Sequence, residues 1–253
     1  MTGSPQQPLV FYDIASGPPV TGFAPNPWKA RYALNFKGAP YRTEWVDLPD
    51  VAAVRKSLGL GAVRAHPDGS PHYTLPILRD ANTGTLVGDS FDIAVYLDSR
   101  YPESPALLPA PGAVGLARAF NAYVDGVFTA ATPLFADGMP LNPATAAATR
   151  AEFCRRAGVD DWDALTARGE EARAQMLGAL EKALEGLAAA YGRTGGAFLE
   201  GGGGETPTYA DFVVGGWLVT LEVCCAEWEQ VRSWQGGVWA RLHDALEPYR
   251  EVK

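Results

Sequence analysis

Two short segments in the first hundred residues carry groups that could hold a small peptide-like ligand. In the first segment, Leu75-Pro76 leads into the apolar pair Ile77-Leu78. Because proline cannot donate a hydrogen bond to a β-sheet, Pro76 should stand at the start of a strand. A cis Leu75–Pro76 bond would turn the Leu75 backbone outward, where it is free to pair with a peptide ligand.

The second segment is an acidic residue followed by a hydroxyl residue. Asp89-Ser90 stands eleven residues after Leu78 and opens an apolar stretch with helical spacing. A carboxylate and a hydroxyl at a helix N-terminus can receive the amine and the carboxylate of a ligand, and the free N–H groups there add an anion site. An ordinary helix cap explains the same residues. Their occurrence beside Leu75-Pro76 favours the ligand.

Strand and helix patterns alternate over this half of the chain. Trp28 and Tyr32 lie four residues apart on one helical face, and residues 42–47 alternate between polar and apolar, as in a half-buried strand. The turn Asn82-Thr83-Gly84 separates two short strands and predicts a hairpin. The order of these elements is that of a thioredoxin-like domain. We expect strands at 9–13, 42–47, 76–79 and 85–87, and helices at 25–36, 50–58 and 89–101.

A proline-rich joint ends this half, and beyond it the strand signals almost vanish. Apolar residues at helical spacing predict helices at 114–131 and 170–191. Residues 208–228 are apolar nearly all round, which predicts a buried central helix, and Thr208 and Asp211 at its start form a capping box. The predicted fold class is therefore α/β plus all-α. The predicted parts are a flexible tail at 1–7, an α/β domain at 8–101, a linker at 102–111 and an α-helical domain at 112–253.

These segments together resemble the glutathione transferase superfamily over residues 8–250. The resemblance is carried by the run 74–78, by Asp89-Ser90, by the joint after Tyr101 and by the run 208–211. The runs 28–38 and 43–46 are similar to those of fungal transferases related to bacterial lignin β-etherases. The resemblance implies a thioredoxin-like glutathione-binding domain, a helical domain and a cleft between them. It also implies glutathione as co-substrate and a homodimer.

A glutathione transferase must stabilise a thiolate near neutral pH, using hydrogen-bond donors and the positive end of a helix. The similar fungal group has a serine directly before a Pro-Asn pair, and this chain has Ala24 there. Since Pro25 and Pro27 lack N–H groups, the donors left in the first helical turn belong to Asn26 and Trp28. Asn26 is the candidate for holding sulfur, although an asparagine that merely favours the turn explains it as well.

Other residues near the predicted cleft are weaker candidates. Thr21 and Ser16 could turn toward the sulfur but fit a solvated loop, and Tyr12 fits a packed strand. His72 precedes Leu75 and could contact the glycyl carboxylate of glutathione. The basic residues that follow in the first helix are expected on a solvated face; they are Lys29, Arg31 and Lys37.

The resemblance gives a set of candidate site residues. An apolar or aromatic electrophile would lie in the cleft, against a wall that includes Phe23, Tyr123 and Phe128. The candidate glutathione contacts are Asn26, Trp28, His72, Leu75, Pro76, Asp89 and Ser90.

Composition excludes several other classes of protein. The 253 residues carry a net charge of −8, which argues against a nucleic-acid partner. We find no apolar run long enough to span a bilayer, no signal peptide at the N-terminus, and no metal-ligand spacing among the three histidines. Three cysteines, two of them adjacent, do not make a disulfide framework, so we expect a reducing, cytoplasmic setting.

Three functional hypotheses remain. The first is a transferase in which the glutathione thiolate attacks an apolar or aromatic electrophile, by conjugation or by ether or peroxide cleavage. The second is a ligandin that holds glutathione or an aromatic metabolite with little turnover, which Ala24 favours. The third is a structural scaffold, against which the intact Asp89-Ser90 pair argues.

Overall fold

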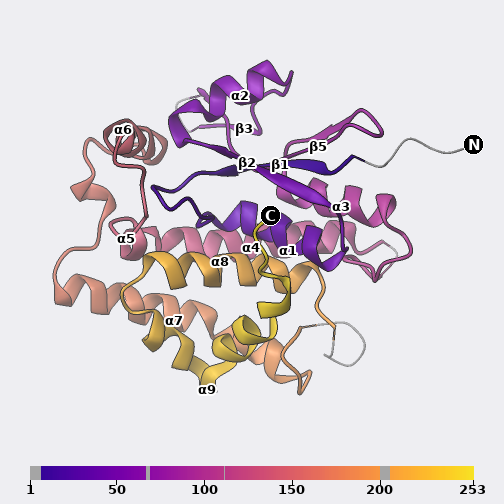
Figure 1. Cartoon of the computed structure of the whole chain (residues 1–253). Coiled ribbons are helices and arrows are strands. Elements are labelled where there is room, and N and C mark those ends of the chain that lie inside the picture. Colours follow the sequence, from indigo (N-terminus) through magenta and orange to yellow (C-terminus); the bar gives the residue numbers. More distant parts are fainter. Residues whose placement is uncertain (1–6, 67–68, 111, 200–205) are drawn as a thin grey trace, which may run out of the picture.

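A β-sheet with flanking helices forms one side of the molecule, and a group of helices forms the other (Figure 1). The structure is a computed structural model that describes residues 7–66, 69–110, 112–199 and 206–253. The predicted tail, apart from its last residue, and the final residue of the predicted linker lie outside the described residues.

The sheet has four strands in the order β2-β1-β5-β6. The buried central strand β1 runs parallel to β2 and antiparallel to β5, and β5 pairs antiparallel with β6. Helices α1 and α3 cover one face of the sheet, and α2 lies over the other (Figure 1). This is the thioredoxin-like arrangement that the order of patterns predicts. The elements are β1 (Leu9–Ile14), α1 (Pro25–Phe36), β2 (Tyr41–Val46), α2 (Val51–Ser57), β5 (Ile77–Asp80), β6 (Thr85–Val87) and α3 (Ser90–Arg100).

The segment before β5 contains the Leu75-Pro76 pair that the sequence singles out. The Leu75–Pro76 peptide bond is cis, and Pro76 stands directly before the first residue of the strand. A short hairpin that the sequence patterns do not predict lies just upstream, between α2 and β5. Its strands are β3 (Arg64–Ala65) and β4 (Pro71–His72), paired antiparallel.

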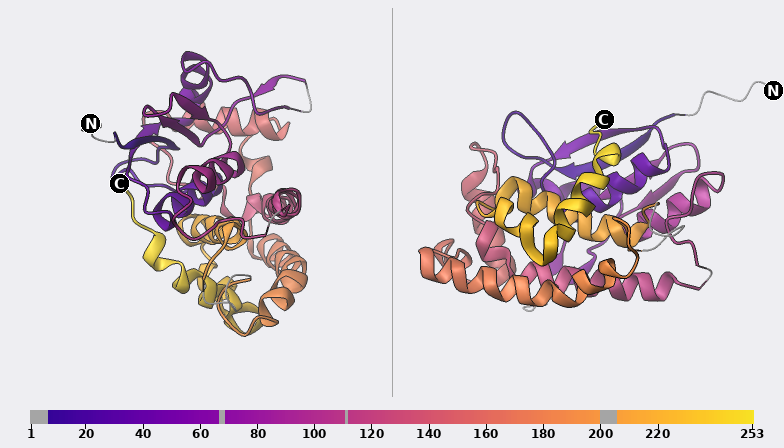
Figure 2. Two further views of the ribbon diagram at one scale, coloured as in Figure 1. Left: turned by 90° about the vertical axis from the view of Figure 1, so that its right-hand side faces the viewer. Right: turned by 90° about the horizontal axis from the view of Figure 1, so that it is seen from below.

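The second half of the chain is helical, as predicted. The central helix α8 is buried along almost its whole length, but it ends at Cys224 and not near residue 228. The backbone of Cys225 is extended (φ −107°, ψ 122°), so the apolar run continues past the helix end into the core. Figure 2 shows α7 and α9 on the side of α8 away from the sheet. The helices are α4 (Val114–Ala130), α5 (Thr132–Phe135), α6 (Ala146–Ala157), α7 (Glu170–Gly192), α8 (Tyr209–Cys224) and α9 (Trp228–Ala245).

Helix α1 packs directly on α8, and this contact joins the two halves of the chain. Tyr32 stacks on Phe212 with ring centroids 5.5 Å apart. A Cβ atom at Gly216 would meet the carbonyl oxygen of Pro25 at 2.6 Å, so only glycine permits this approach. The Thr220 hydroxyl donates to the Phe23 carbonyl over 2.8 Å. Helix α8 therefore packs against the first turn of α1 and helps to fix its position.

The expectation of a solvated basic face on α1 is wrong. Lys29, Arg31 and Lys37 are buried, with at most 4% of each residue exposed. Because α1 lies between the sheet and α8, it has no such face. Each cation is instead paired with a carboxylate, as a buried charge must be to remain ionised. The pairs are Lys29–Asp125, Arg31–Asp13 and Lys37–Asp98.

Membrane-spanning helices, metal-ligand groups and cysteines were each the subject of an expectation from the sequence. Within the described part of the chain, the helices all lack the combination of length and apolar character needed to cross a membrane. No group of three or more His, Cys, Asp or Glu side chains among these residues could hold a metal ion. Cys154, Cys224 and Cys225 are free thiols and are buried.

Candidate functional site

The first turn of α1 leaves few hydrogen-bond donors for a ligand. Ala24 is the N-cap residue and makes no side-chain capping bond. The Trp28 N–H donates to the Ala24 carbonyl over 3.2 Å, and the Trp28 indole is buried, so neither donor of Trp28 faces a cavity. Thr21 is exposed, and its backbone N–H donates to the hydroxyl of the buried Ser16. The Asn26 donors therefore remain.

Asn26 is half-buried and lines two adjacent cavities. Its Oδ1 accepts a hydrogen bond from the Lys29 Nζ over 2.7 Å. Its Nδ2 makes no hydrogen bond to another described residue. The side-chain amide is thus held on its acceptor side and retains two N–H groups for a ligand.

We call the first of these cavities the polar cleft; its volume is about 630 Å³. It brings Leu75 and Pro76, which precede β5, beside Asp89 and Ser90 at the start of α3, with Asn26 from α1. The segments that the sequence singles out therefore meet in one cavity, which α4 closes on the far side through Asn121 and Asp125.

Asp89 caps helix α3 with only one of its two carboxylate oxygens. Its Oδ1 accepts the backbone N–H groups of Phe91 and Asp92, at 2.9 and 3.3 Å, and so caps α3. Its Oδ2 accepts no hydrogen bond from another described residue, and Asp89 lines the polar cleft. The cap and the ligand interpretation are therefore compatible, because they use different oxygens.

Arg55 connects the two ligand segments, although no sequence pattern singles it out. Its Nη1 donates to the Thr74 carbonyl over 2.7 Å and to the Gly88 carbonyl over 2.9 Å. These residues directly precede Leu75 and Asp89. Arg55 is buried, and a Cβ atom at Gly88 would lie 2.6 Å from its guanidinium. One side chain from α2 thus fixes the spacing between the two walls of the polar cleft.

The β3–β4 hairpin contributes basic groups to the same region. His72 and Arg64 line both the polar cleft and its neighbour. Burial, together with the nearby Arg156 and Arg64, lowers the pKa of His72 to about 4. His72 is therefore neutral near pH 7, whereas the exposed Arg64 is a cation that could meet an anionic group.

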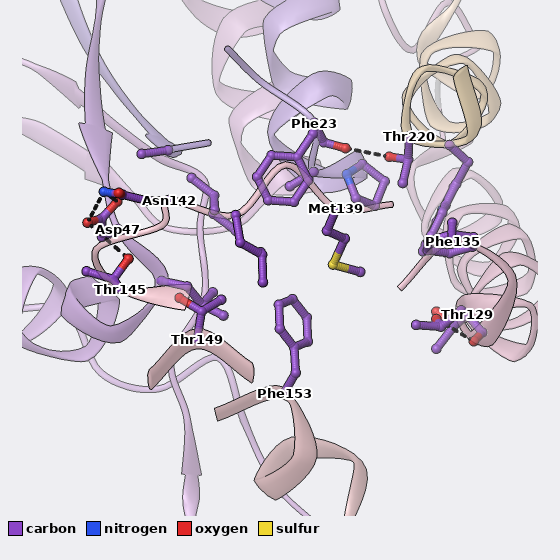
Figure 3. Close-up of a pocket in the computed structure, with 18 residues that line it drawn as sticks. Phe23, Asp47, Thr129, Phe135, Met139, Asn142, Thr145, Thr149, Phe153 and Thr220 are labelled. Atoms are coloured by element: carbon purple, nitrogen blue, oxygen red, sulfur yellow. Dashed lines mark hydrogen bonds between the residues drawn. The ribbon is translucent and has the colours of Figure 1, made fainter. Parts of the chain in front are cut away.

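Two less polar cavities adjoin the polar cleft. The apolar cleft, of about 870 Å³, shares Asn26 and Leu75 with the polar cleft and continues past Ala24 to Phe153 of α6. The inner pocket, of about 190 Å³, lies beyond Ala24, and Phe23, Met139 and Phe153 point into it (Figure 3). Ala24 lines both of these cavities and adds no hydroxyl to the wall that they share.

The inner pocket is closed on one side by contacts between the two halves of the chain. The Asn142 amide donates to the Asp47 carboxylate over 3.0 Å, and the Thr145 hydroxyl donates to it over 3.4 Å (Figure 3). These contacts hold the segment before α6 against the end of β2. Thr129 of α4 lines all three cavities, and no sequence pattern singles it out either.

The three expected acceptor-site residues lie in different surroundings. Phe23 lines the inner pocket. Tyr123 is 51% exposed, and Phe128 is fully buried, with its ring stacked on Trp217 at 5.5 Å. Neither Tyr123 nor Phe128 is among the residues that line the apolar cleft or the inner pocket.

The family models that match the chain cover both of its halves. Residues 23–100 match the glutathione S-transferase N-terminal domain, and residues 115–249 match the glutathione S-transferase C-terminal domain. The chain therefore belongs to the glutathione S-transferase family. Glutathione is the co-substrate of that family.

Individual relatives agree with this assignment. The chain is 32% identical to a glutathione S-transferase of Ceriporiopsis subvermispora solved in complex with glutathione; the match covers 98% of this chain and 99% of that one, with a TM-score of 0.87. A glutathione transferase of Phanerochaete chrysosporium gives 32% identity, coverage of 98% and 99%, and a TM-score of 0.85.

A curated relative matches over a shorter length. It is a glutathione S-transferase-like protein of Aspergillus flavus, 34% identical over 129 residues. That match spans 48% of this chain and 45% of the relative, so the chain spans less than half the length of the curated relative it matches.

Proposed function

We propose that this protein is a glutathione transferase that binds glutathione in the polar cleft and an apolar or aromatic electrophile in the apolar cleft. The observation that carries the proposal is the meeting of Leu75, Asp89, Ser90 and Asn26 in one cavity. Bound glutathione would supply the thiolate that attacks the electrophile. The protein's own residues would bind the tripeptide, stabilise its sulfur and receive the electrophile.

The polar cleft fits the two ends of the tripeptide differently. Asp89 Oδ2 would accept the γ-glutamyl ammonium, while Ser90 and the start of α3 would take the γ-glutamyl carboxylate. Leu75 would pair with the cysteinyl backbone, because the Leu75 N–H makes no backbone hydrogen bond to another described residue. Arg64 would face the glycyl carboxylate, and the neutral His72 would add at most a hydrogen bond.

The sulfur would lie beside Asn26, at the boundary between the polar and apolar clefts. The Asn26 Nδ2 and backbone N–H are donors there, and the position lies at the N-terminus of α1, where the helix dipole favours negative charge. A neutral amide stabilises a thiolate without having to lose a proton itself. In this proposal Asn26 replaces the hydroxyl that is missing at residue 24.

The electrophile would extend from the apolar cleft past Ala24 and place its ring in the inner pocket, between Phe23, Phe153 and Met139. The inner pocket alone is close to the size of a cavity of about 150 Å³ that accepts benzene in another protein, so a single ring would fill it. The acceptor wall would then consist of Phe23 before α1, of α5 and α6, and of the loop between these two helices, with Tyr123 and Phe128 outside it.

A ligandin is the second candidate, and Ala24 is the observation that favours it. The deciding experiment has two measurements on the purified protein: glutathione affinity by calorimetry, and turnover of glutathione with an activated aryl halide. Tight binding with turnover supports the transferase. Tight binding of glutathione or of the aromatic compound without turnover supports the ligandin, and absence of glutathione binding rejects the transferase proposal.

Assembly and location belong to the same proposal. We propose a homodimer that works in a reducing, cytoplasmic setting, in keeping with three free, buried thiols. Sedimentation of the purified protein would give its oligomeric state, and a monomer at micromolar concentration would contradict the dimer.

A further inference from the structure

A fully buried ammonium group lies directly behind the residue proposed to hold sulfur. The Lys29 side chain is 0% exposed, and its Nζ contacts three side chains. It donates to Asn26 Oδ1 over 2.7 Å, to Asn121 Oδ1 over 3.2 Å and to the Asp125 carboxylate. Asn26, Asn121 and Asp125 line the polar cleft, and Lys29 does not.

We propose that Lys29 is a positioning residue that orients the Asn26 amide so that its N–H groups point to the sulfur of glutathione. This inference rests on the proposed function, because it concerns how the same site holds the thiolate. It gives Lys29 no contact with glutathione and no part in proton transfer.

The orientation follows from the donor and acceptor inventory. A lysine ammonium has three N–H donors and no acceptor, whereas an asparagine side chain has one oxygen acceptor and one N–H₂ donor group. Only Oδ1 of Asn26 can therefore face Lys29 Nζ. Once Oδ1 is held there, Nδ2 lies on the opposite side of the amide, and Asn26 presents a donor to the cleft and not an acceptor. An oxygen facing a thiolate would repel it.

The ammonium is itself held by groups from three elements. Asp125 of α4 is its closest carboxylate, and Asp89 at the start of α3 is the other charge that acts on it. Burial lowers the pKa of Lys29, and the two carboxylates oppose that shift. Asp125 is fixed in turn by the Trp217 indole N–H at 2.7 Å and by the Asn121 amide at 2.9 Å.

The close approach of α8 keeps Lys29 in place. A Cβ atom at Gly216 would meet the Lys29 Cγ at 3.1 Å and the Lys29 backbone nitrogen at 3.3 Å. The stem of the side chain thus runs along a helix backbone with little free space. Because Lys29 and Asp125 together carry no net charge, Lys29 acts on the sulfur through the amide and not as an isolated charge.

The test is the ultraviolet absorbance of the glutathione thiolate, titrated against pH with glutathione bound to each protein. Lys29→Met keeps the apolar stem and removes the donor. We expect the thiol pKa to rise by about one unit, the shift that corresponds to a lost hydrogen bond of about 1.4 kcal/mol. That is roughly tenfold less thiolate at any pH below the titration.

The matched control is Lys37→Met. Lys37 is the C-cap residue of the same helix, has a side chain that is 1% exposed and pairs with Asp98 at 2.9 Å, but it does not line the polar cleft. Removing this buried lysine from the end of α1 should leave the thiol titration unchanged. Equal shifts in the two variants would mean a general disturbance of α1 and would overturn the inference.

A second comparison tests whether Lys29 acts through Asn26. In an Asn26→Ala background, Lys29→Met should cause no further shift, because the amide that it orients is gone. A full additional shift would overturn the positioning role. If Lys29→Met alone did not fold, the double variant Lys29→Met/Asp125→Asn removes both charges of the pair, keeps an amide for Trp217, and carries the same expectation.

The outcomes separate this inference from the proposed function. If calorimetry showed no glutathione binding to the unaltered protein, both would fall. If the unaltered protein and Lys29→Met bound glutathione and titrated alike, the proposed function would stand and Lys29 would be only a structural residue of the interface.

Discussion

Ala24 is the residue whose change tests the proposed chemistry most directly. Ala24→Ser would place a hydroxyl beside the proposed sulfur position and would give α1 the side-chain cap that it lacks. We expect the bound thiol pKa to fall by about one unit and turnover to rise, since one added hydrogen bond contributes on the order of 1 kcal/mol. Identical thiolate titrations of both proteins would show that residue 24 is not the missing group.

Asp89 offers a second test, in which binding can be separated from folding. Asp89→Asn keeps an oxygen to cap α3, because asparagine is as good an N-cap as aspartate, but it removes the charge that would meet the γ-glutamyl ammonium. We expect glutathione affinity to fall by about 1.5–3 kcal/mol, the scale of a lost charge-assisted hydrogen bond. Calorimetry on the purified variant measures it.

The control for Asp89 is Asp92→Asn. Asp92 stands in the first turn of the same helix, its side chain is 52% exposed, and it does not line the polar cleft. This variant should bind glutathione as the unaltered protein does. Equal losses in the two variants would mean that general electrostatics, and not a contact at Asp89, sets the affinity.

The residues that line the polar cleft or support its walls fall into two groups, according to whether a local sequence pattern marks them. Leu75 and Asp89 carry local signals, a proline at a strand start and an acidic helix cap, so the sequence singles them out. Lys29 and Arg55 carry no such signal, because the groups that they contact are distant in the sequence. Asp125 is 96 residues from Lys29, and Thr74 and Gly88 are 19 and 33 residues from Arg55. Pairings of this kind depend on the tertiary fold and leave no local pattern.

The contact between α1 and α8 governs the geometry of the first turn. Gly216→Ala would place a methyl group 2.6 Å from the Pro25 carbonyl oxygen. Because this oxygen belongs to the backbone, the clash can be relieved only if α1 moves. We expect the variant to lose about 1–3 kcal/mol of unfolding free energy, the usual cost of overpacking. Urea unfolding followed by circular dichroism would give the difference.

Gly178→Ala supplies the matched control for this prediction. Gly178 lies in α7, and a Cβ atom there has open space around it. An alanine should therefore stabilise the helix by about 0.5–1 kcal/mol, through the lower entropy of the unfolded chain. The two substitutions are chemically identical, so effects of the same sign would contradict the packing argument.

Hydrophobic periodicity predicts a helix or strand well when the element has a distinct apolar face. It fails when the element is too short for a pattern or has buried charges. The leucine spacing of α7 and the apolar surface of α8 are sufficient to predict both helices. The basic residues at 29, 31 and 37 mislead because charge normally marks a solvated face, whereas here each cation is buried and pairs with a carboxylate on another element. The β3–β4 hairpin escapes prediction because each strand has two residues, too few for an alternating pattern.

The last residues of the chain contact strand β2, at the edge of the sheet. The Lys253 carbonyl accepts the Thr43 N–H over 2.9 Å, and the Glu251 carbonyl accepts the Tyr41 hydroxyl over 3.0 Å. The C-terminal residues thus pack against the sheet of the first half, a contact that local sequence patterns do not predict. The division into domains at 8–101 and 112–253 stays a prediction.

An ion pair between Arg173 and Glu227 ties the helical half together. The Arg173 Nε and Nη2 donate to the two oxygens of Glu227 at 2.7 and 2.6 Å, and Nη2 also donates to the Leu134 carbonyl over 2.8 Å. One guanidinium thereby connects α5, α7 and the start of α9. The hydrogen bonds from Arg173 lower the pKa of Glu227 to about 2, from an ordinary value of 4.5.

The lowered pKa of Glu227 predicts a loss of stability in acid. The folded state keeps this carboxylate charged at pH values where the unfolded chain has protonated it, so its contribution is complete above about pH 4.5 and is lost as the pH falls toward about 2. The contribution at neutral pH is on the order of 2–3 kcal/mol. Glu227→Gln should therefore have a smaller free energy of unfolding than the unaltered protein near pH 7. Below about pH 4.5 the free energy of unfolding of the variant should fall less steeply, so that the curves of the two proteins converge near pH 2. Urea unfolding at a series of pH values gives both curves.

Glu229→Gln is the control, because this neighbour's side chain is 82% exposed and its replacement should change stability by less than about 0.5 kcal/mol. Parallel curves for Glu227→Gln and the unaltered protein would show that the pair with Arg173 does not set the acid response.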